Sequence, residues 1–267
     1  MFTLRAARTT LASISTVAAA TLGLALVPAS APSASPAPST AALSGTASSA
    51  ATVNRVIRRV APRPAALSSS SYAFASVVDS QPVRWNPCAP IRWTSNTTRG
   101  PAGGLDVLKA SVARIAATTG TTWQYVGPTT TVPTADYLPR SATTAYPPVL
   151  LGWTDGAASD MLRSQPRSVL GMTRSAWFGV QKPDGRKIVA TRAAVVALDR
   201  TDVLPLRGGT SWSSVVLHEL GHAMGLAHTP DNSQLMATIL PRTVTDLQSG
   251  DRAGLTRLGR TAGCIVL

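Results

Sequence analysis

All three histidines of the chain, and its only glutamate, lie within one window of eleven residues that runs from His218 to His228. The window reads H-E-x-x-H-x-x-G-x-x-H, in which Glu219, His222 and Gly225 occupy the other fixed positions. Neutral imidazole is a common zinc ligand, and a carboxylate beside a bound metal can exchange protons with water. Because the chain uses histidine and glutamate nowhere else, the window predicts one metal site with a general base next to it.

The spacing of these residues suits that chemistry. Residues four apart lie on one face of an α-helix, so His218 and His222 can present two imidazole nitrogens to the same cation. Glu219 follows about 100° around the helix, beside the metal rather than bound to it. Gly225 can adopt the left-handed conformation that ends a helix, and the resulting bend lets His228 reach the metal from outside the helix. Three nitrogen ligands with one open position are typical of catalytic zinc, and a metal site without catalysis is the alternative.

Met236 follows eight residues after His228, in the sequence Leu-Met-Ala. Together with the histidine window, this pattern resembles the metzincin clan of zinc endopeptidases, and in particular the matrixin family. The resemblance implies that His218, His222 and His228 hold a zinc ion that activates a water molecule, and that Glu219 is the general base that takes its proton. It also implies that Met236 forms the Met-turn beneath the metal, for which an ordinary core methionine is the alternative.

The pattern of apolar residues predicts an α+β domain, because short apolar runs alternate with stripes at helical spacing. The predicted strands are 91–93, 123–126, 149–153 and 195–198, the last within the segment 188–198. The predicted helices are 105–119, 213–224 and a last helix through 258 that Ser249, Gly250 and Asp251 can cap. The resemblance implies the metzincin fold, which is a twisted mixed sheet with two long helices plus a small C-terminal subdomain with a helix. It further implies an edge strand that pairs with an extended substrate, here at 168–171 or in the following segment to 178, unless these residues form only a surface loop.

The chain departs from the matrixin pattern in two respects. No pro-segment motif supplies a cysteine that could occupy the open zinc position, and no histidine remains for a second, structural zinc. A structural calcium ion could bind through aspartates such as Asp155, Asp160 or Asp199, although a solvated aspartate is the simpler interpretation of each.

The N-terminal residues predict secretion. Residues 1–31 have the order of a signal peptide: arginines, an apolar stretch at 17–27, and then Ala29-Ser30-Ala31. Residues 32–80 are rich in alanine, serine and proline, so we expect a disordered pro-segment or linker there. The remaining residues, 81–267, suffice for one matrixin-like zinc metallopeptidase domain.

The chain has two cysteines, Cys88 and Cys264, near the two ends of this domain. In a secreted protein such a pair predicts a disulfide, and two free thiols are the alternative. We expect a secreted or cell-wall-associated protein with no stable membrane insertion once the signal peptide is removed.

The formal net charge of +13 could draw the protein to acidic surfaces, but no nucleic-acid motif accompanies it and we expect no nucleic-acid partner. We expect a monomer whose partner is a protein or peptide substrate. The predicted function is a secreted zinc-dependent endopeptidase. The alternatives are a zinc amidase of the same fold that acts on cell-wall peptides, and a binding module without catalysis.

Overall fold

The computed structural model describes residues 71–143 and 145–266 of the chain. The predicted signal peptide at 1–31, and residues 32–70 of the predicted pro-segment or linker, lie outside the described residues.

A mixed sheet forms the centre of the domain, and its five strands are β4 (Ile91–Asn96), β5 (Trp123–Pro128), β6 (Val149–Thr154), β7 (Gly171–Gln181) and β8 (Lys187–Asp199). Their spatial order is β5-β4-β6-β8-β7. Strands β5, β4, β6 and β8 run parallel to one another, whereas β7 is antiparallel to β8 and lies at the edge of the sheet. Every residue of β6 is buried, as expected for a central parallel strand. The four strands predicted from apolar runs are confirmed, and the edge strand begins where the first predicted placement ends.

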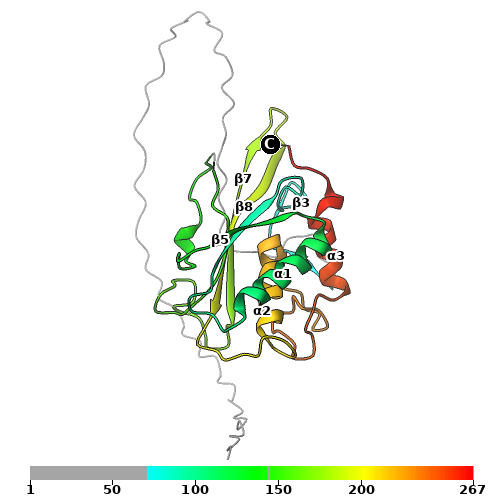
Figure 1. The fold of residues 1–267 in the computed structure, drawn as a ribbon. Helices are drawn as coiled ribbons and strands as arrows, with labels where there is room; N and C mark the ends of the chain where they lie inside the picture. Colours follow the sequence, from blue (N-terminus) through cyan, green and yellow to red (C-terminus); the bar gives the residue numbers. More distant parts are fainter. Residues whose placement is uncertain (1–70, 144, 267) are drawn as a thin grey trace, which may run out of the picture. The chain divides into compact units, whose positions relative to one another are not determined.

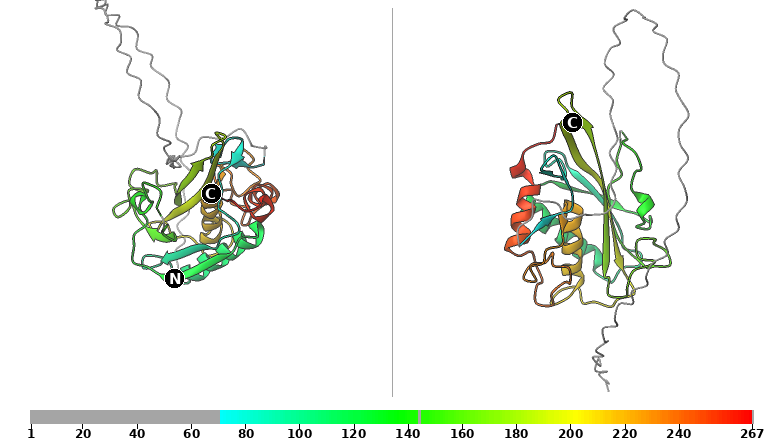
Figure 2. Two further views of the ribbon diagram at one scale, coloured as in Figure 1. Left: turned by 90° about the horizontal axis from the view of Figure 1, so that it is seen from above. Right: turned by 180° about the vertical axis from the view of Figure 1, so that it is seen from behind.

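Two long helices, α1 (Gly104–Thr119) and α2 (Trp212–Met224), pack together on one side of the sheet (Figures 1 and 2). The apolar stripe that predicted α1 faces the core, where Leu108 and Ile115 are fully buried. On the sheet side, Trp153 of β6 meets Trp212 at the start of α2 in an edge-to-face contact, with 5.6 Å between the ring centroids. The core between helices and sheet therefore fixes where α2 lies.

The opposite side of the sheet is covered by the long connections on either side of β6. The first contains a short 3-10 helix, η1 (Ala135–Tyr137), and buries Leu138; the second buries Met161 and Leu162. Phe178 of β7 belongs to the same apolar cluster. Both faces of the sheet are thus buried, which agrees with the predicted α+β class.

The folded domain begins earlier than predicted. Strand β1 (Ala73–Phe74) pairs with β9 (Leu226–Ala227), and Phe74 is fully buried. Next along the chain, β2 (Val77–Val78) and β3 (Gln81–Pro82) form a small hairpin. The predicted start at residue 81 is therefore wrong for 71–80. The composition of 32–80 as a whole concealed the few large apolar side chains at its end, which bury enough surface to order the segment.

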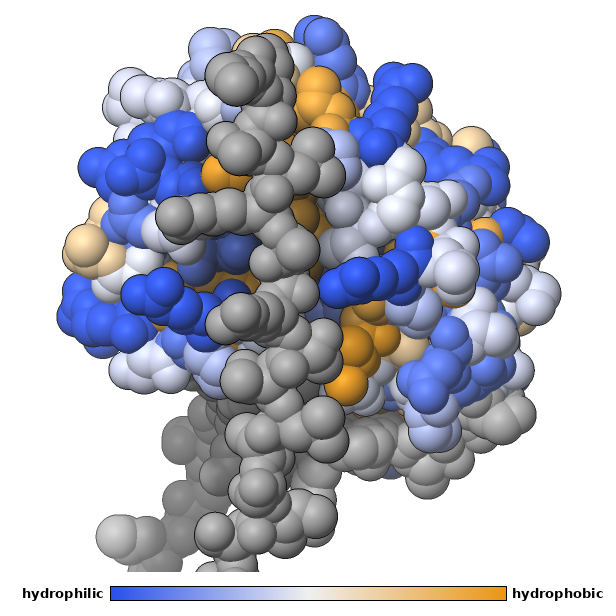
Figure 3. All heavy atoms as spheres, turned by 90° about the horizontal axis from the view of Figure 1, so that it is seen from below, coloured by the Kyte–Doolittle hydropathy of each residue, from blue (hydrophilic) through white to orange (hydrophobic). Residues whose placement is uncertain are grey.

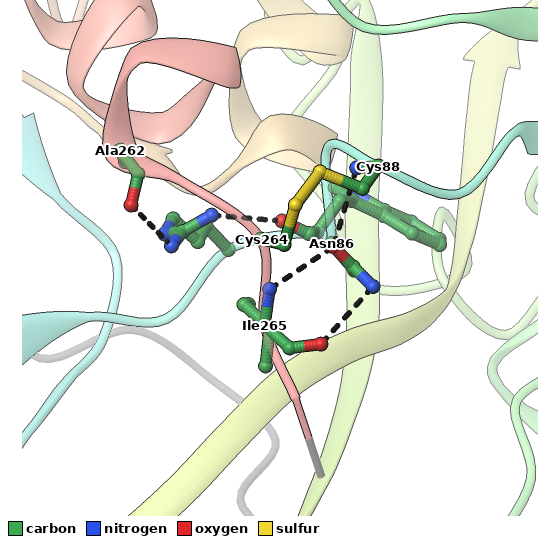
Figure 4. The surroundings of a disulfide bond; sticks show 7 residues. Asn86, Cys88, Ala262, Cys264 and Ile265 are labelled. Carbon is green, nitrogen blue, oxygen red and sulfur yellow. Dashed lines mark hydrogen bonds between the residues drawn. A yellow bond between two sulfur atoms is a disulfide. The ribbon is translucent and has the colours of Figure 1, made fainter.

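The C-terminal part consists of α3 (Ser249–Leu258), the 3-10 helix η2 (Arg260–Ala262) and a tail that returns to the start of the domain. The tail is joined there by the predicted disulfide between Cys88 and Cys264 (Figure 4). Beside the disulfide, the side chain of Asn86 donates to the carbonyl oxygen of Ile265 and accepts from its N–H, both at 3.1 Å. The disulfide spans 176 residues, for which the chain-entropy model gives a stabilisation of about 5 kcal/mol.

Large hydrophobic side chains are exposed at four described positions: Val126, Val203, Ile239 and Val266. On the face drawn in Figure 3, the visible apolar areas are small and separated by hydrophilic residues. Across 71–143 and 145–266, no helix has both the length and the hydropathy required to span a bilayer.

Candidate metal centre

Helix α2 carries two of the three histidines, and both of its ends are fixed locally. At the start, the side chain of Ser211 accepts from the Ser214 N–H, while the Ser214 hydroxyl accepts from the Ser211 N–H, which forms a capping box. At the end, Gly225 has φ 118°, and a Cβ there would lie only 2.8 Å from the carbonyl oxygen of Val83. Glycine is thus required at 225 both for the backbone conformation and for the space. The chain then turns through β9 to His228, as the sequence predicted.

The structure brings the three histidines together. Nε2 of His228 lies 3.2 Å from Nε2 of His218 and 3.1 Å from Nε2 of His222. The three form a group whose ligand atoms all lie within 4.8 Å of one another. Four tetrahedral bonds of about 2.1 Å would place two ligand nitrogens about 3.4 Å apart, so the spacing fits a zinc ion.

Backbone carbonyls determine which ring nitrogens carry hydrogen. Nδ1 of His218 donates to the carbonyl oxygen of Leu235 at 2.7 Å, and Nδ1 of His222 donates to that of Leu226 at 2.9 Å. A carbonyl oxygen can only accept, so both Nδ1 atoms carry hydrogen, and the lone pair of either ring in its neutral form lies on Nε2. These lone pairs face the space shared with His228, which is the arrangement that a cation requires.

The surroundings of His222 and His228 also favour the neutral form of these two rings. Burial, together with the neighbouring histidines His218 and His228, lowers the pKa of His222 well below its usual value. Burial and electrostatic repulsion between the rings of His218 and His228 lower the pKa of His228 to about 4. Neutral imidazole is the metal-binding form, so the pocket prepares these side chains as ligands at neutral pH.

Glu219 lies beside this group, with only 6% of its surface exposed. Burial raises the pKa of its carboxyl group, while the charge of His218 and a hydrogen bond from Thr173 lower the pKa. The Thr173 hydroxyl donates to Oε2 of Glu219 at 2.6 Å. The sequence placed Glu219 next to the metal but gave no sign of Thr173, which belongs to β7 and lies 46 residues away.

Met236 is fully buried against the middle of α2, where a Cβ added to Gly221 would collide with its sulfur atom. Gly221 lies between His218 and His222, so the methionine packs beneath the turn of helix that presents both rings. The role of Met236 as a Met-turn stays a prediction from the resemblance. The N–H of Thr229 donates to the carbonyl oxygen of Met236 at 2.9 Å, which ties this segment to the residue after His228.

The Met236 segment is held in turn by the first residues of α3. The buried carboxylate of Asp251 accepts from the N–H groups of Leu235 at 2.8 Å and Met236 at 3.1 Å. In the opposite direction, Oε1 of Gln234 accepts from the N–H groups of Gly250 and Asp251. The sequence predicted that Asp251 would help to cap a helix, but not that it would support the metal centre.

The aspartates considered for calcium are engaged in other contacts. The Asp155 carboxylate accepts from Arg99 at 2.9 Å and from Arg200 at 2.8 Å. The Arg200 hydrogen bond lowers the pKa of Asp155. Two guanidinium groups oppose a calcium ion at that carboxylate. Among the described residues, the histidine group is the only cluster of three or more His, Cys, Asp or Glu side chains arranged to hold a metal.

Comparison with known proteins agrees with this geometry. The family model for matrixin, Peptidase_M10, matches residues 121–259, which is more than half of the chain and includes the histidine window and Met236. No curated protein matches the chain. The residues present fit the zinc ion that the family implies, and the chain belongs to the matrixin family of zinc metallopeptidases.

Proposed function

We propose that the protein is a secreted zinc-dependent endopeptidase in which Glu219 acts as the general base. The observation that carries the proposal is the convergence of three Nε2 atoms beside a buried carboxylate. When bound by His218, His222 and His228, zinc would supply Lewis-acid chemistry that makes water a better nucleophile and polarises a carbonyl group. Glu219 would accept the proton of the attacking water and deliver it to the leaving amine.

The edge strand β7 is the proposed place for the substrate. Among the described strands it has a neighbour on one side only. Near its start, Thr173 donates a hydrogen bond to Glu219, and a Cβ added at Gly171 would lie 2.9 Å from Cγ of Glu219. An extended peptide that pairs with this edge would use backbone hydrogen bonds, which any sequence can form. The scissile peptide group would then lie next to the general base.

We further propose that the mature protein acts outside the cytoplasm. The order of residues in 1–31 and the Cys88–Cys264 disulfide support this, because disulfides persist in oxidising compartments. The substrate would be a protein or a peptide. A zinc amidase that acts on cell-wall peptides is the second candidate, and it shares every residue named for the mechanism.

The test uses the secreted full chain and its Glu219→Gln variant, each loaded with zinc. Both are incubated with a mixed peptide library and with peptidoglycan, and the products are read by mass spectrometry. We expect the wild type to cleave library peptides, and the variant to retain one zinc ion per chain while losing nearly all turnover. Cleavage of peptidoglycan alone would favour the amidase. Normal cleavage by Glu219→Gln would refute the role of Glu219.

A further inference from the structure

Glu219 rests on two residues of the edge strand, and neither belongs to the histidine window. We propose that Thr173 is a positioning residue that fixes the orientation of the Glu219 carboxylate, and that Gly171 provides the space this orientation needs. The inference rests on the proposed function, because it assigns Glu219 the role of general base.

The contact between Thr173 and Glu219 involves both ends of the glutamate. Oγ1 of Thr173 lies 2.6 Å from Oε2 of Glu219 and 3.0 Å from its backbone carbonyl oxygen. The shorter distance is typical of a hydroxyl that donates to a carboxylate. A glutamate side chain has several rotatable bonds, so holding Oε2 against the strand removes most of its freedom. The other oxygen, Oε1, is then the one left to exchange protons.

Gly171 limits the same carboxyl group from a second side. Side chains alternate along a strand, so positions 171 and 173 present the same face of β7 to α2. A Cβ added at Gly171 would lie 2.9 Å from Cγ of Glu219 and 3.1 Å from both Cδ and Oε1. Any larger residue at 171 would therefore push the carboxyl group away from its place beside Thr173.

This arrangement links the base to the strand that the proposed function assigns to substrate pairing. β7 is held in register by its neighbour β8, where Thr173 faces Val196 and Gly171 faces Leu198. A substrate that pairs with β7 and a Glu219 carboxylate that accepts a hydrogen bond from β7 would both be positioned by the same strand. Their relative position would then depend on the strand rather than on the flexible tip of a side chain, which is the preorganisation that proton transfer needs.

The kinetic test compares Thr173→Val, which removes the hydroxyl at nearly constant volume, with Thr173→Ser, which retains it. Thr154→Val is the matched control, because Thr154 is a buried threonine of the same sheet whose hydroxyl has no hydrogen-bond partner in the described residues. We expect Thr173→Val to lower kcat about tenfold to a hundredfold, with KM nearly unchanged and one zinc ion bound. Loss of a hydrogen bond just outside the ligands of a metal site typically lowers activity by such a factor. Thr173→Ser should restore most of kcat, and Thr154→Val should behave as the wild type. A Thr173→Val variant with normal kcat would overturn the proposal.

A second measurement does not depend on activity. Urea denaturation of the zinc-loaded full chain is recorded for Thr173→Val, for Glu219→Ala and for the double variant. We expect Thr173→Val to lower the midpoint in the wild-type background and to change it far less when Glu219 is already alanine. Equal shifts in both backgrounds would show that the hydroxyl does not hold the carboxylate, and would overturn the proposal. Clear coupling in a protein that cleaves no peptide would retain the contact and refute the proposed function instead.

Discussion

Replacement of Asp251 by asparagine would test whether helix α3 supports the metal centre. The Asp251 carboxylate is fully buried, and three N–H groups donate to it: Leu235 at 2.8 Å and Gln248 at 2.7 Å to Oδ2, and Met236 at 3.1 Å to Oδ1. An asparagine has one oxygen, which would take the place of Oδ2 because two donors meet there. Its amide nitrogen would then face the N–H of Met236, donor against donor.

The cost can be worked out from these contacts. Two charge-assisted hydrogen bonds become neutral, and one buried N–H loses its acceptor, so we expect a loss of about 2–4 kcal/mol in the free energy of unfolding. In a domain of this size that corresponds to a melting temperature lower by about 5–15 °C. Zinc affinity should fall as well, because the carbonyl group of Leu235 accepts the hydrogen bond from Nδ1 of His218.

The assay is thermal denaturation of the zinc-loaded protein, together with competition for zinc by a chelator. Asp106→Asn is the matched control, because Asp106 is also an acidic residue in the first turn of a helix but is exposed. Loss of its interaction with the helix dipole should cost less than about 1 kcal/mol. If Asp251→Asn melts at the wild-type temperature and binds zinc equally well, the Asp251 hydrogen bonds do not support the site.

Two further variants test other parts of the domain. The hydrogen bond from Arg200 holds the pKa of Asp155 below its usual 3.8, so the stability that this contact contributes is complete above that value and is lost as the pH falls below it. Asp155→Asn should therefore have a lower melting temperature than the wild type at pH 7, and the difference between the two melting temperatures should narrow in acid. An equal difference at pH 7 and pH 3 would contradict this. Gly225→Ala should destabilise the protein more than Gly127→Ala in urea denaturation: both glycines have positive φ, but only at 225 would the added Cβ approach a carbonyl oxygen, that of Val83. Equal decreases in the free energy of unfolding of the two variants would show that the close contact with the Val83 carbonyl oxygen does not destabilise the protein.

Features whose cause is local could be predicted from the sequence. The helix 105–119 follows from its apolar stripe and from Gly120, which has the left-handed conformation. The N–H of Gly120 donates a hydrogen bond to the carbonyl oxygen of Ala116. The histidine group follows from the period of the helix and from the turn at Gly225. The central strands follow from apolar runs with no polar alternation. In each case, residues within a few positions of one another determine the result.

The contacts that were missed join residues far apart in the chain. Thr173 is 46 positions from Glu219, and Asp251 is 16 positions from Leu235. A threonine in an apolar strand and an aspartate near a helix start are common for other reasons, so neither residue type announces its partner. Phe74 was missed in a different way, because two aromatic residues, Tyr72 and Phe74, at the end of a segment rich in alanine and serine hardly change the average composition on which disorder was predicted.

The two histidines on α2 show why part of the site has no sequence signature. Each histidine is oriented by a backbone carbonyl, His218 by that of Leu235 and His222 by that of Leu226, and every residue has such a group. What matters is the structure that holds each carbonyl in place. The Leu235 peptide is held by Asp251 at the start of α3, and Leu226 pairs with Phe74 in β1. The C-terminal part of the domain therefore supports His218, and the N-terminal part supports His222. Removal of the N-terminal residues through β1 should weaken zinc binding, although every residue of the motif would remain.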